Sequence, residues 1–251
     1  AGQMIMAGFR GLVLDPDDPI AAALAEGQVG GVILFSRDVA LSGPRNIESP
    51  QQVKALIAQV RAAAPGAIFV AVDQEGGKVQ RLSAKNGFTD WPSAKSLGQG
   101  TPENTRRTAE RMAAELADVG FDLNFAPAVD LDLPNSPAIG KLERAFAADP
   151  AAVTAHARAF IQGMAAHQIT PAIKHFPGHG SATGDTHDGF VDISRTWTPA
   201  ELEPYKTLLG EGFSGMVMVA HVTLAPGDLP ADLNPEIING LLRRDLGWQG
   251  V

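Results

Sequence analysis

Six short runs of apolar residues recur along the chain, with amphipathic stretches between them. The runs are nearly continuous in apolar side chains, as in VGGVILF, AIFVAVD and SGMVMVAHV. Continuous apolar runs of this length are typical of strands that are buried on both faces of a parallel sheet. The pattern therefore predicts six strands, at residues 4–9, 29–35, 67–73, 121–127, 169–175 and 214–222.

Between these runs, apolar residues recur at three- and four-residue spacing, which predicts helices with one buried face. Val53, Leu56 and Val60 are an example. Each predicted helix starts with a residue that can cap it followed by proline, which suits the first helical position. Thr198 and Glu201 also have the spacing of a capping box. The six capping pairs are 18–19, 49–50, 101–102, 149–150, 198–199 and 234–235.

Alternating strands and helices indicate a parallel α/β fold, either a doubly wound sheet or a closed barrel. Polar residues follow several different strands, namely Asp73, Asp130, Lys174 with His175, and His221. Barrel active sites are built from the carboxyl ends of many strands, whereas a doubly wound sheet concentrates its site at one switch point. We therefore predict a (β/α)8 TIM-type barrel, with residues 1–251 as a single catalytic domain.

The strand count falls short of a closed barrel, which needs eight strands. Six strands are recognisable, and a seventh would begin near Gly250 and Val251. We therefore expect residues 1–251 to lack the C-terminal strands of the barrel.

Composition excludes several classes of protein. The 251 residues include 45% hydrophobic and 19% charged residues, a globular composition. The net charge of −8 argues against a nucleic-acid partner, and the absence of cysteine excludes disulfides and thiol chemistry. No apolar run is long enough for a membrane span, and no signal peptide is recognisable. Because the chain begins with Ala1 and not Met, the compartment stays open between cytoplasm and periplasm, with the cytoplasm slightly favoured. The oligomeric state also stays open.

Three segments carry residues suited to chemistry on a sugar. Residues 73–81 place an Asp at a strand end before Gln, Glu and two glycines, and a carboxylate there can accept hydroxyl hydrogen bonds. Residues 140–146 contain Arg144, whose guanidinium can fork onto vicinal hydroxyls or a carboxylate, with an ordinary surface Arg as the alternative. Residues 174–189 hold three His, two Asp and four Gly in one loop.

The His-rich loop admits several interpretations. Pro177 and Gly178 break any helical spacing between His175 and His179, so a metal site is not expected. The phosphate-binding pattern GxxxxGK[ST] is absent. A His beside a carboxylate in a glycine-rich loop is better interpreted as an acid/base pair, with solvent-exposed histidines as the alternative.

At these residues the sequence resembles glycoside hydrolase family 3, specifically its β-N-acetylglucosaminidase branch. The most specific motif is KHFPGHGSATGDTH at 174–187, and DQEGGKVQRL at 73–82 is nearly as distinctive. The strings FAPAVDLD, IGKLERAF and MVAHV at 125–132, 139–146 and 218–222 support them. The resemblance covers nearly the whole chain.

The resemblance implies the roles of individual residues. It implies that His187 is the acid/base and Asp185 its partner, and that no cofactor or metal takes part. The substrate-binding residues that it implies are Asp73, Arg81, Arg144, Lys174 and His175. The resemblance also implies an Asp nucleophile about four residues beyond Val251, the attacking group that a retaining mechanism needs in addition to the acid/base.

The implied activity is a retaining exo-β-N-acetylglucosaminidase that works through a glycosyl-enzyme intermediate. Its expected substrates are N-acetylglucosamine-containing saccharides, either peptidoglycan fragments of cell-wall recycling or chitooligosaccharides. A phosphorylase, with phosphate in place of water, is one alternative. A catalytically dead sugar-binding barrel without its nucleophile is the other.

Overall fold

The computed structural model describes residues 2–186, 189–225 and 227–251, and its backbone is organised around one curled parallel sheet. Six strands pair in chain order, so each strand lies beside the next one along the sequence. The strands are β1 (Met6–Gly8), β2 (Gly31–Ile33), β5 (Phe69–Val72), β8 (Leu123–Asn124), β9 (Thr170–Phe176) and β11 (Met216–Val219). All six predicted strands are confirmed, although most are shorter than the apolar runs that predicted them.

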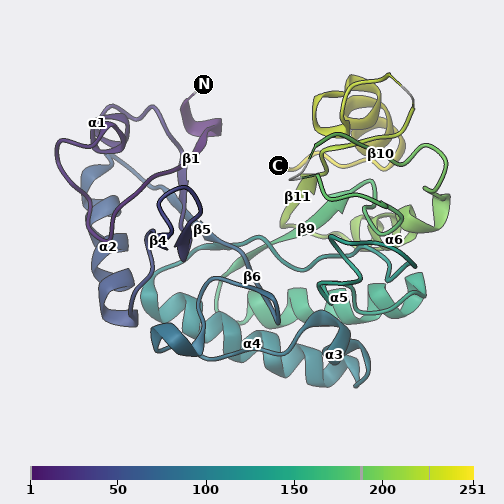
Figure 1. Ribbon diagram of the computed structural model, residues 1–251, viewed down its shortest axis with the longest axis horizontal. Helices are drawn as coiled ribbons and strands as arrows, with labels where there is room; N and C mark the ends of the chain where they lie inside the picture. The colour runs from purple at the N-terminus through teal and green to yellow at the C-terminus, as the bar shows by residue number, and fades with distance from the viewer. Residues whose placement is uncertain (1, 187–188, 226) are drawn as a thin grey trace.

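The sheet curls into part of a barrel, which confirms the predicted fold class. In Figure 1 the edge strand β1 lies on the left, above β5, and the other edge strand β11 lies to the right of centre, above β9. The backbone nitrogen of Val217 in β11 donates to the carbonyl oxygen of Val251 at 2.9 Å. The end of the chain therefore lies beside β11, where the seventh strand was expected to begin.

Helices alternate with the strands, and four of them begin at the predicted prolines Pro19, Pro50, Pro102 and Pro150. The start predicted at Pro199 opens a short 3-10 helix, so the α-helix behind it begins only at Glu203, and the helix at Ala94–Gly98 was not predicted. The helices are α1 (Pro19–Ala25), α2 (Pro50–Ala63), α3 (Ala94–Gly98), α4 (Pro102–Val119), α5 (Pro150–Ala165), α6 (Glu203–Gly210) and the π-helical segment η5 (Glu236–Asp245). The side chains of Asp18, Ser49, Thr101 and Asp149 each accept a backbone hydrogen bond from the first turn of the helix they precede.

The predicted capping box at Thr198 is wrong. Thr198 precedes the short 3-10 helix η3 (Pro199–Leu202), and its side chain makes no capping hydrogen bond. The side chain of Glu201 turns into the protein and is fully buried. It accepts a hydrogen bond from the backbone nitrogen of Ser181 as well as interacting with the backbone of Thr198, so a tertiary contact is added where the Thr198 side-chain half of the motif is missing.

Helices α4 and α5 pack against each other and cover one side of the sheet (Figure 1). Their contact is close because Gly163 in α5 lies against the backbone of Arg106 in α4. Met112, Leu116 and Phe160 are almost fully buried in the core between helices and sheet. None of the described helices combines the length and the apolar character needed to cross a membrane.

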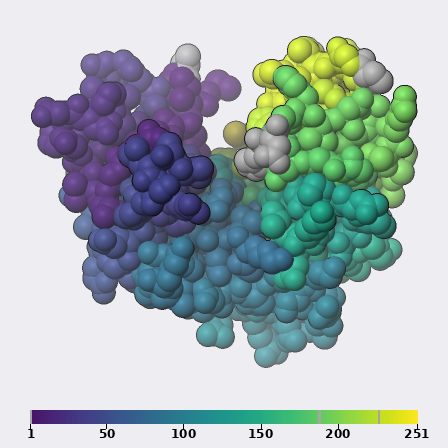
Figure 2. Space-filling view, in the orientation of Figure 1, coloured from purple at the N-terminus to yellow at the C-terminus, as the bar shows by residue number. Residues whose placement is uncertain are grey.

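Three small two-stranded sheets lie outside the barrel strands. They are β3–β4 (Arg37–Asp38 and Gly43–Pro44), β6–β7 (Gln74–Gly76 and Val79–Gln80) and β10–β12 (Val191–Asp192 and Val222–Thr223). Strands β3, β6 and β12 each begin within a few residues of the carboxyl end of a barrel strand. Figure 2 shows the surface hollowed between the N-terminal residues and the C-terminal third of the chain.

Candidate active site

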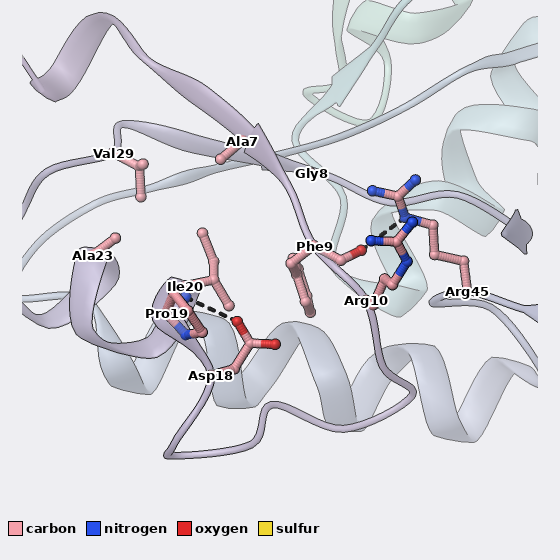
Figure 3. Close-up of a pocket in the computed structure, with 10 residues that line it drawn as sticks. All are labelled: Ala7, Gly8, Phe9, Arg10, Asp18, Pro19, Ile20, Ala23, Val29 and Arg45. Carbon is pink, nitrogen blue, oxygen red and sulfur yellow. Dashed lines mark hydrogen bonds between the residues drawn. The ribbon is translucent and has the colours of Figure 1, made fainter. Parts of the chain in front are cut away.

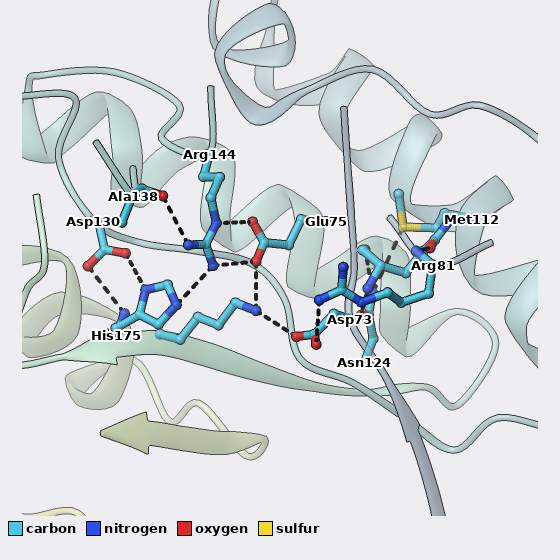
Figure 4. Close-up of polar contacts among 11 residues, drawn as sticks. Asp73, Glu75, Arg81, Met112, Asn124, Asp130, Ala138, Arg144 and His175 are labelled. Carbon is cyan, nitrogen blue, oxygen red and sulfur yellow. Dashed lines mark hydrogen bonds and ion pairs between the residues drawn. The ribbon is translucent and has the colours of Figure 1, made fainter. Parts of the chain in front are cut away.

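A network of charged side chains gathers at the carboxyl ends of three neighbouring strands. Asp73 and Glu75 follow β5, Asp130 follows β8, and Lys174 and His175 lie in β9. Figure 4 shows these side chains joined by hydrogen bonds and ion pairs. Parallel strands bring their carboxyl ends to one edge of the sheet, which explains why residues so far apart in sequence meet here.

Lys174 connects the two carboxylates that follow β5. Its Nζ lies 3.0 Å from Oδ1 of Asp73 and 2.7 Å from Oε1 of Glu75. The Lys174 side chain is only 2% exposed, so both interactions operate away from water. Arg81 adds a second cation on the outer side, with its Nη2 3.2 Å from Oδ2 of Asp73.

Arg144 joins Glu75 to His175. Its Nε and Nη2 donate to the two oxygens of Glu75 at 2.9 and 2.7 Å, a bidentate pair. Its Nη1 donates to the carbonyl oxygen of Ala138 at 3.1 Å, which ties the guanidinium to its own loop. Nη2 also lies 3.0 Å from Nε2 of His175. These four contacts therefore fix the orientation of the Arg144 guanidinium in the unliganded protein.

The hydrogen bonds of His175 fix its tautomer. Nδ1 lies 2.6 Å from Oδ2 of Asp130, and Nε2 faces a guanidinium that can only donate. Nδ1 must therefore carry the proton, and Nε2 accepts from Arg144. Burial lowers the pKa of His175 to about 4, and the positive charges of Arg144 and Lys174 outweigh part of the opposing influence of Asp130. The imidazole is neutral at pH 7.

The carboxylates of the network stay ionised. Burial alone would raise the pKa of Glu75, but Lys174 and Arg144 more than compensate, so its pKa lies well below the usual range. The pKa of Asp73 is lowered in the same way against burial, by Lys174 and Arg81. The pKa of Asp130 is also lowered, because its interactions with His175 and the backbone of His179 outweigh burial. Asp73 and Glu75 thus face the cations Lys174, Arg81 and Arg144, whereas Asp130 faces the neutral His175.

The local structure after β5 explains the DQEGGKVQRL string. Oε1 of Gln74 accepts from the backbone nitrogens of Arg81 and Leu82 at 2.9 and 3.1 Å, which folds β7 back onto β6. A Cβ at Gly77 would lie 2.5 Å from Cβ of Ser93, and at Gly76 it would collide with the carbonyl oxygen of Pro92. Both glycines also have positive φ, so side chains are excluded here.

The loop after β9 is anchored to the same network at its start. Oδ1 of Asp130 accepts from the backbone nitrogen of His179 at 2.8 Å. Asp185 lies farther along this loop and is half-buried. His187 lies outside the described residues, so its pairing with Asp185 stays a prediction.

All five residues predicted to bind substrate meet in this network: Asp73, Arg81, Arg144, Lys174 and His175. The prediction omitted Glu75 and Asp130, which hold the others in place. Both lie just after barrel strands, and this position, where barrel active sites are built, could have identified them from the sequence. Among the described residues, no group of three or more His, Asp or Glu side chains is arranged to hold a metal ion.

A pocket of about 430 Å³ lies elsewhere, between β1 and α1 (Figure 3). Its polar groups are used internally: Asp18 accepts from the backbone nitrogen of Ile20 at 3.0 Å, and Nε of Arg45 donates to the carbonyl oxygen of Phe9 at 2.8 Å. The pocket shares no residue with the charged network, so its volume does not mark the site.

A family model described as the glycosyl hydrolase family 3 N-terminal domain matches residues 1–251. The chain belongs to glycosyl hydrolase family 3. Within this family it is 36% identical to a beta-hexosaminidase of Nitrosomonas eutropha over 98% of the chain, and 39% identical to one of Stenotrophomonas maltophilia over 89%. It spans 70% and 66% of the lengths of these two relatives.

Solved structures of the family have the same fold. A β-N-acetylglucosaminidase from Paenibacillus sp. superposes with a TM-score of 0.88 at 33% identity, covering 100% of this chain and 47% of that one. NagZ from Neisseria gonorrhoeae in complex with N-trifluoroacetyl-D-glucosamine superposes with a TM-score of 0.86 at 33% identity, covering 98% and 72%. The family membership thus agrees with the curled parallel sheet.

Proposed function

We propose that the protein is an exo-β-N-acetylglucosaminidase that hydrolyses terminal β-linked N-acetylglucosamine with retention of configuration. The observation that carries the proposal is the charged network at the carboxyl ends of β5, β8 and β9, in a chain of family 3. Within the network, the side chains of Lys174 and Glu75 are only 2% and 3% exposed, whereas those of Arg81 and Asp73 are 30% and 17% exposed.

The exposed rim of the network suits a sugar. Sugar hydroxyls both donate and accept hydrogen bonds, and the rim offers an acceptor in Asp73 and donors in Arg81 and Arg144. The buried ion pairs below keep these groups in fixed positions, so that little ordering is needed when a sugar binds. In this assignment Asp73, Arg81, Arg144, Lys174 and His175 hold the terminal sugar.

The chemistry of cleavage is assigned to the loop after β9. His187 donates a proton to the leaving oxygen, and Asp185 sets its basicity and orientation. A carboxylate nucleophile attacks the anomeric carbon, forming a glycosyl-enzyme intermediate that water then cleaves with His187 as base. The substrates proposed are peptidoglycan fragments or chitooligosaccharides, in line with the N-acetylglucosamine analogue bound by the gonococcal relative.

The test compares two glycosides of N-acetyl-β-glucosamine, one with a dinitrophenyl and one with an alkyl leaving group. His187→Ala should lower kcat/KM for the alkyl glycoside by about 10²–10⁴-fold, the usual range for loss of general acid catalysis. The dinitrophenyl glycoside should lose far less, because its leaving group needs little protonation. His167→Ala, at an exposed histidine after α5, is the matched control and should leave both rates unchanged.

A loss of less than tenfold on the alkyl glycoside would remove His187 from the acid/base role. Mass spectrometry after exposure to an activated 5-fluoro N-acetylglucosamine inhibitor tests the covalent step, since a retaining enzyme gains the mass of one sugar. Release of sugar 1-phosphate in phosphate buffer would identify a phosphorylase instead. Binding of N-acetylglucosamine with no turnover of either glycoside would identify a sugar-binding protein.

A further inference from the structure

The first part of the loop after β9, residues 177–182, is held by two buried side chains and one half-buried side chain outside it. Nε1 of Trp197 donates to the carbonyl oxygen of Pro177 at 3.2 Å. Asp130 accepts from the backbone nitrogen of His179 at 2.8 Å, and Oε2 of Glu201 accepts from that of Ser181 at 3.2 Å. Asp130 belongs to the sugar-binding network, but Glu201 and Trp197 do not.

Glu201 lies flat against the loop backbone. A Cβ at Gly178 would lie 2.5 Å from Cβ of Glu201, and a Cβ at Gly180 would lie 3.2 Å from its Oε2. On its other side, Gly180 is so close to the backbone of Leu131 that a Cβ would collide with the carbonyl oxygen. The glycines of the PGHG string therefore allow the loop to pass between the β8 end and η3.

The burial of Glu201 is unfavourable for stability. The residue is 0% exposed, and among the described residues it forms no ion pair. Its Oε1 has no hydrogen-bond partner, and neither has the buried hydroxyl of Tyr205, which lies one helical turn further along. Burial raises the pKa of Glu201, so the carboxyl group is destabilised in its ionised form. Because burying this carboxyl group lowers the stability of the fold, we look for its role in function.

We propose that Glu201 is a positioning residue, which fixes the start of the acid/base loop through the backbone of Ser181. The inference rests on the proposed function, because it assumes that His187 protonates the leaving group. Ser181 precedes Asp185 by only four residues, so a displacement at Ser181 is passed directly to the acid/base pair. Proton transfer is sensitive to such displacement, since a shift of about 1 Å can cost 10²-fold in rate.

The test is Glu201→Ala in the intact protein, assayed by kcat/KM, which reports the first, bond-cleaving step. For the alkyl glycoside kcat/KM should fall by about 10–100-fold. For the dinitrophenyl glycoside it should fall by less than about threefold, because that leaving group needs little protonation. A residue that merely stabilised the fold would affect both substrates equally. Glu201→Gln should restore the alkyl rate to within about threefold, because its amide oxygen can accept from Ser181.

Two further variants complete the design. Tyr205→Phe removes a buried hydroxyl without a partner from the same region, and it should leave both rates unchanged. Trp197→Phe removes the hydrogen bond to Pro177 together with part of the packing of the indole ring, and it should show the same dependence on the leaving group with a smaller loss. If Glu201→Ala does not fold, as judged by circular dichroism, Trp197→Phe decides the question.

Equal losses on both glycosides, no loss on either, or failure of Glu201→Gln to restore the rate would overturn the inference. Failure of the proposed function would look different, because the unmodified protein would then cleave neither glycoside. The two failures are therefore distinguished by the activity of the unmodified protein.

Discussion

At the scale of single residues, the hydrogen bonds of Asp130 set the state of His175. Oδ1 of Asp130 accepts two backbone N–H groups, so in Asp130→Asn the amide oxygen must take that position. The amide NH2 would then face Nδ1 of His175 and force the ring proton onto Nε2, against the donors of Arg144. One buried hydrogen bond would be lost.

Asp130→Asn should lower the free energy of unfolding by about 1–3 kcal/mol, the range for a buried polar group left unpaired. The ring-nitrogen chemical shifts of His175 should report loss of the Nδ1–H tautomer. Asp132→Asn is the matched control, because the partner of Asp132 is the half-exposed Lys95. Its effect should stay within about 1 kcal/mol. An unchanged tautomer in Asp130→Asn would contradict the hydrogen-bond assignment.

The sequence predicted which polar residues meet at the strand ends better than which residues hold them in place. Lys174, Arg144 and Asp73 stand in recognisable strings, and the structure brings them together. Glu75 and Glu201 were harder to assign because their partners are distant in sequence, and a carboxylate beside a helix start resembles an ordinary cap. Glu201 shows the difficulty most clearly, since its spacing from Thr198 predicted only a local motif, whereas the carboxylate also accepts from the distant backbone nitrogen of Ser181.

At the scale of elements, helix starts were predictable because capping is local. Asp18, Ser49, Thr101 and Asp149 cap the helices that follow them, and each signal lies within three residues of the contact it makes. The small sheets β6–β7 and β10–β12 were not predicted. They are two or three residues long per strand, and side chains such as Gln74 hold them from outside the strand pattern.

Close contact between α4 and α5 predicts opposite effects for two helical glycines. A Cβ at Gly163 would lie 2.5 Å from the carbonyl oxygen of Arg106 and 2.6 Å from Cβ of Ala109. Gly163→Ala should therefore lower the free energy of unfolding by about 1–3 kcal/mol, because overpacking outweighs the helix propensity of alanine.

Gly210, the last residue of α6, is the matched control because a Cβ there would meet nothing within 4 Å. Gly210→Ala should raise the free energy of unfolding by about 0.4–1 kcal/mol, through the lower entropy of the unfolded chain. Urea denaturation measures both. Destabilisation of equal size in the two variants would mean that close helix packing is not the cause.

At the scale of the whole molecule, the barrel architecture was predictable because each strand pairs with its sequence neighbour. The order of elements therefore determines the sheet order, and polar residues at successive strand ends indicate on which edge the site lies. What the order of elements does not give is the register of the strands, which decides that Lys174 reaches both Asp73 and Glu75.

The free energy of unfolding should depend on pH through buried groups whose contributions have opposite signs. Burial lowers the pKa of His175 to about 4, against about 6.5 in an unfolded chain, and it also lowers the pKa of His156. As the pH falls through 6.5, the unfolded state binds protons that the folded state does not. Each histidine therefore removes stability, with a slope of at most about 1.4 kcal/mol per pH unit. Above that pH they contribute no dependence.

Glu201 acts in the opposite direction, because burial raises its pKa, so the folded state binds a proton before the unfolded state does. Stability from this group is gained as the pH falls towards about 4.5. Urea denaturation between pH 7 and 4.5 should therefore show Glu201→Gln more stable than the unmodified protein at pH 7, and losing stability more steeply in acid. Parallel curves of unfolding free energy against pH for the two proteins would mean that the pKa of Glu201 is the same in the folded and unfolded states. Burial of Glu201 would then not be unfavourable, and that support for its positioning role would fail.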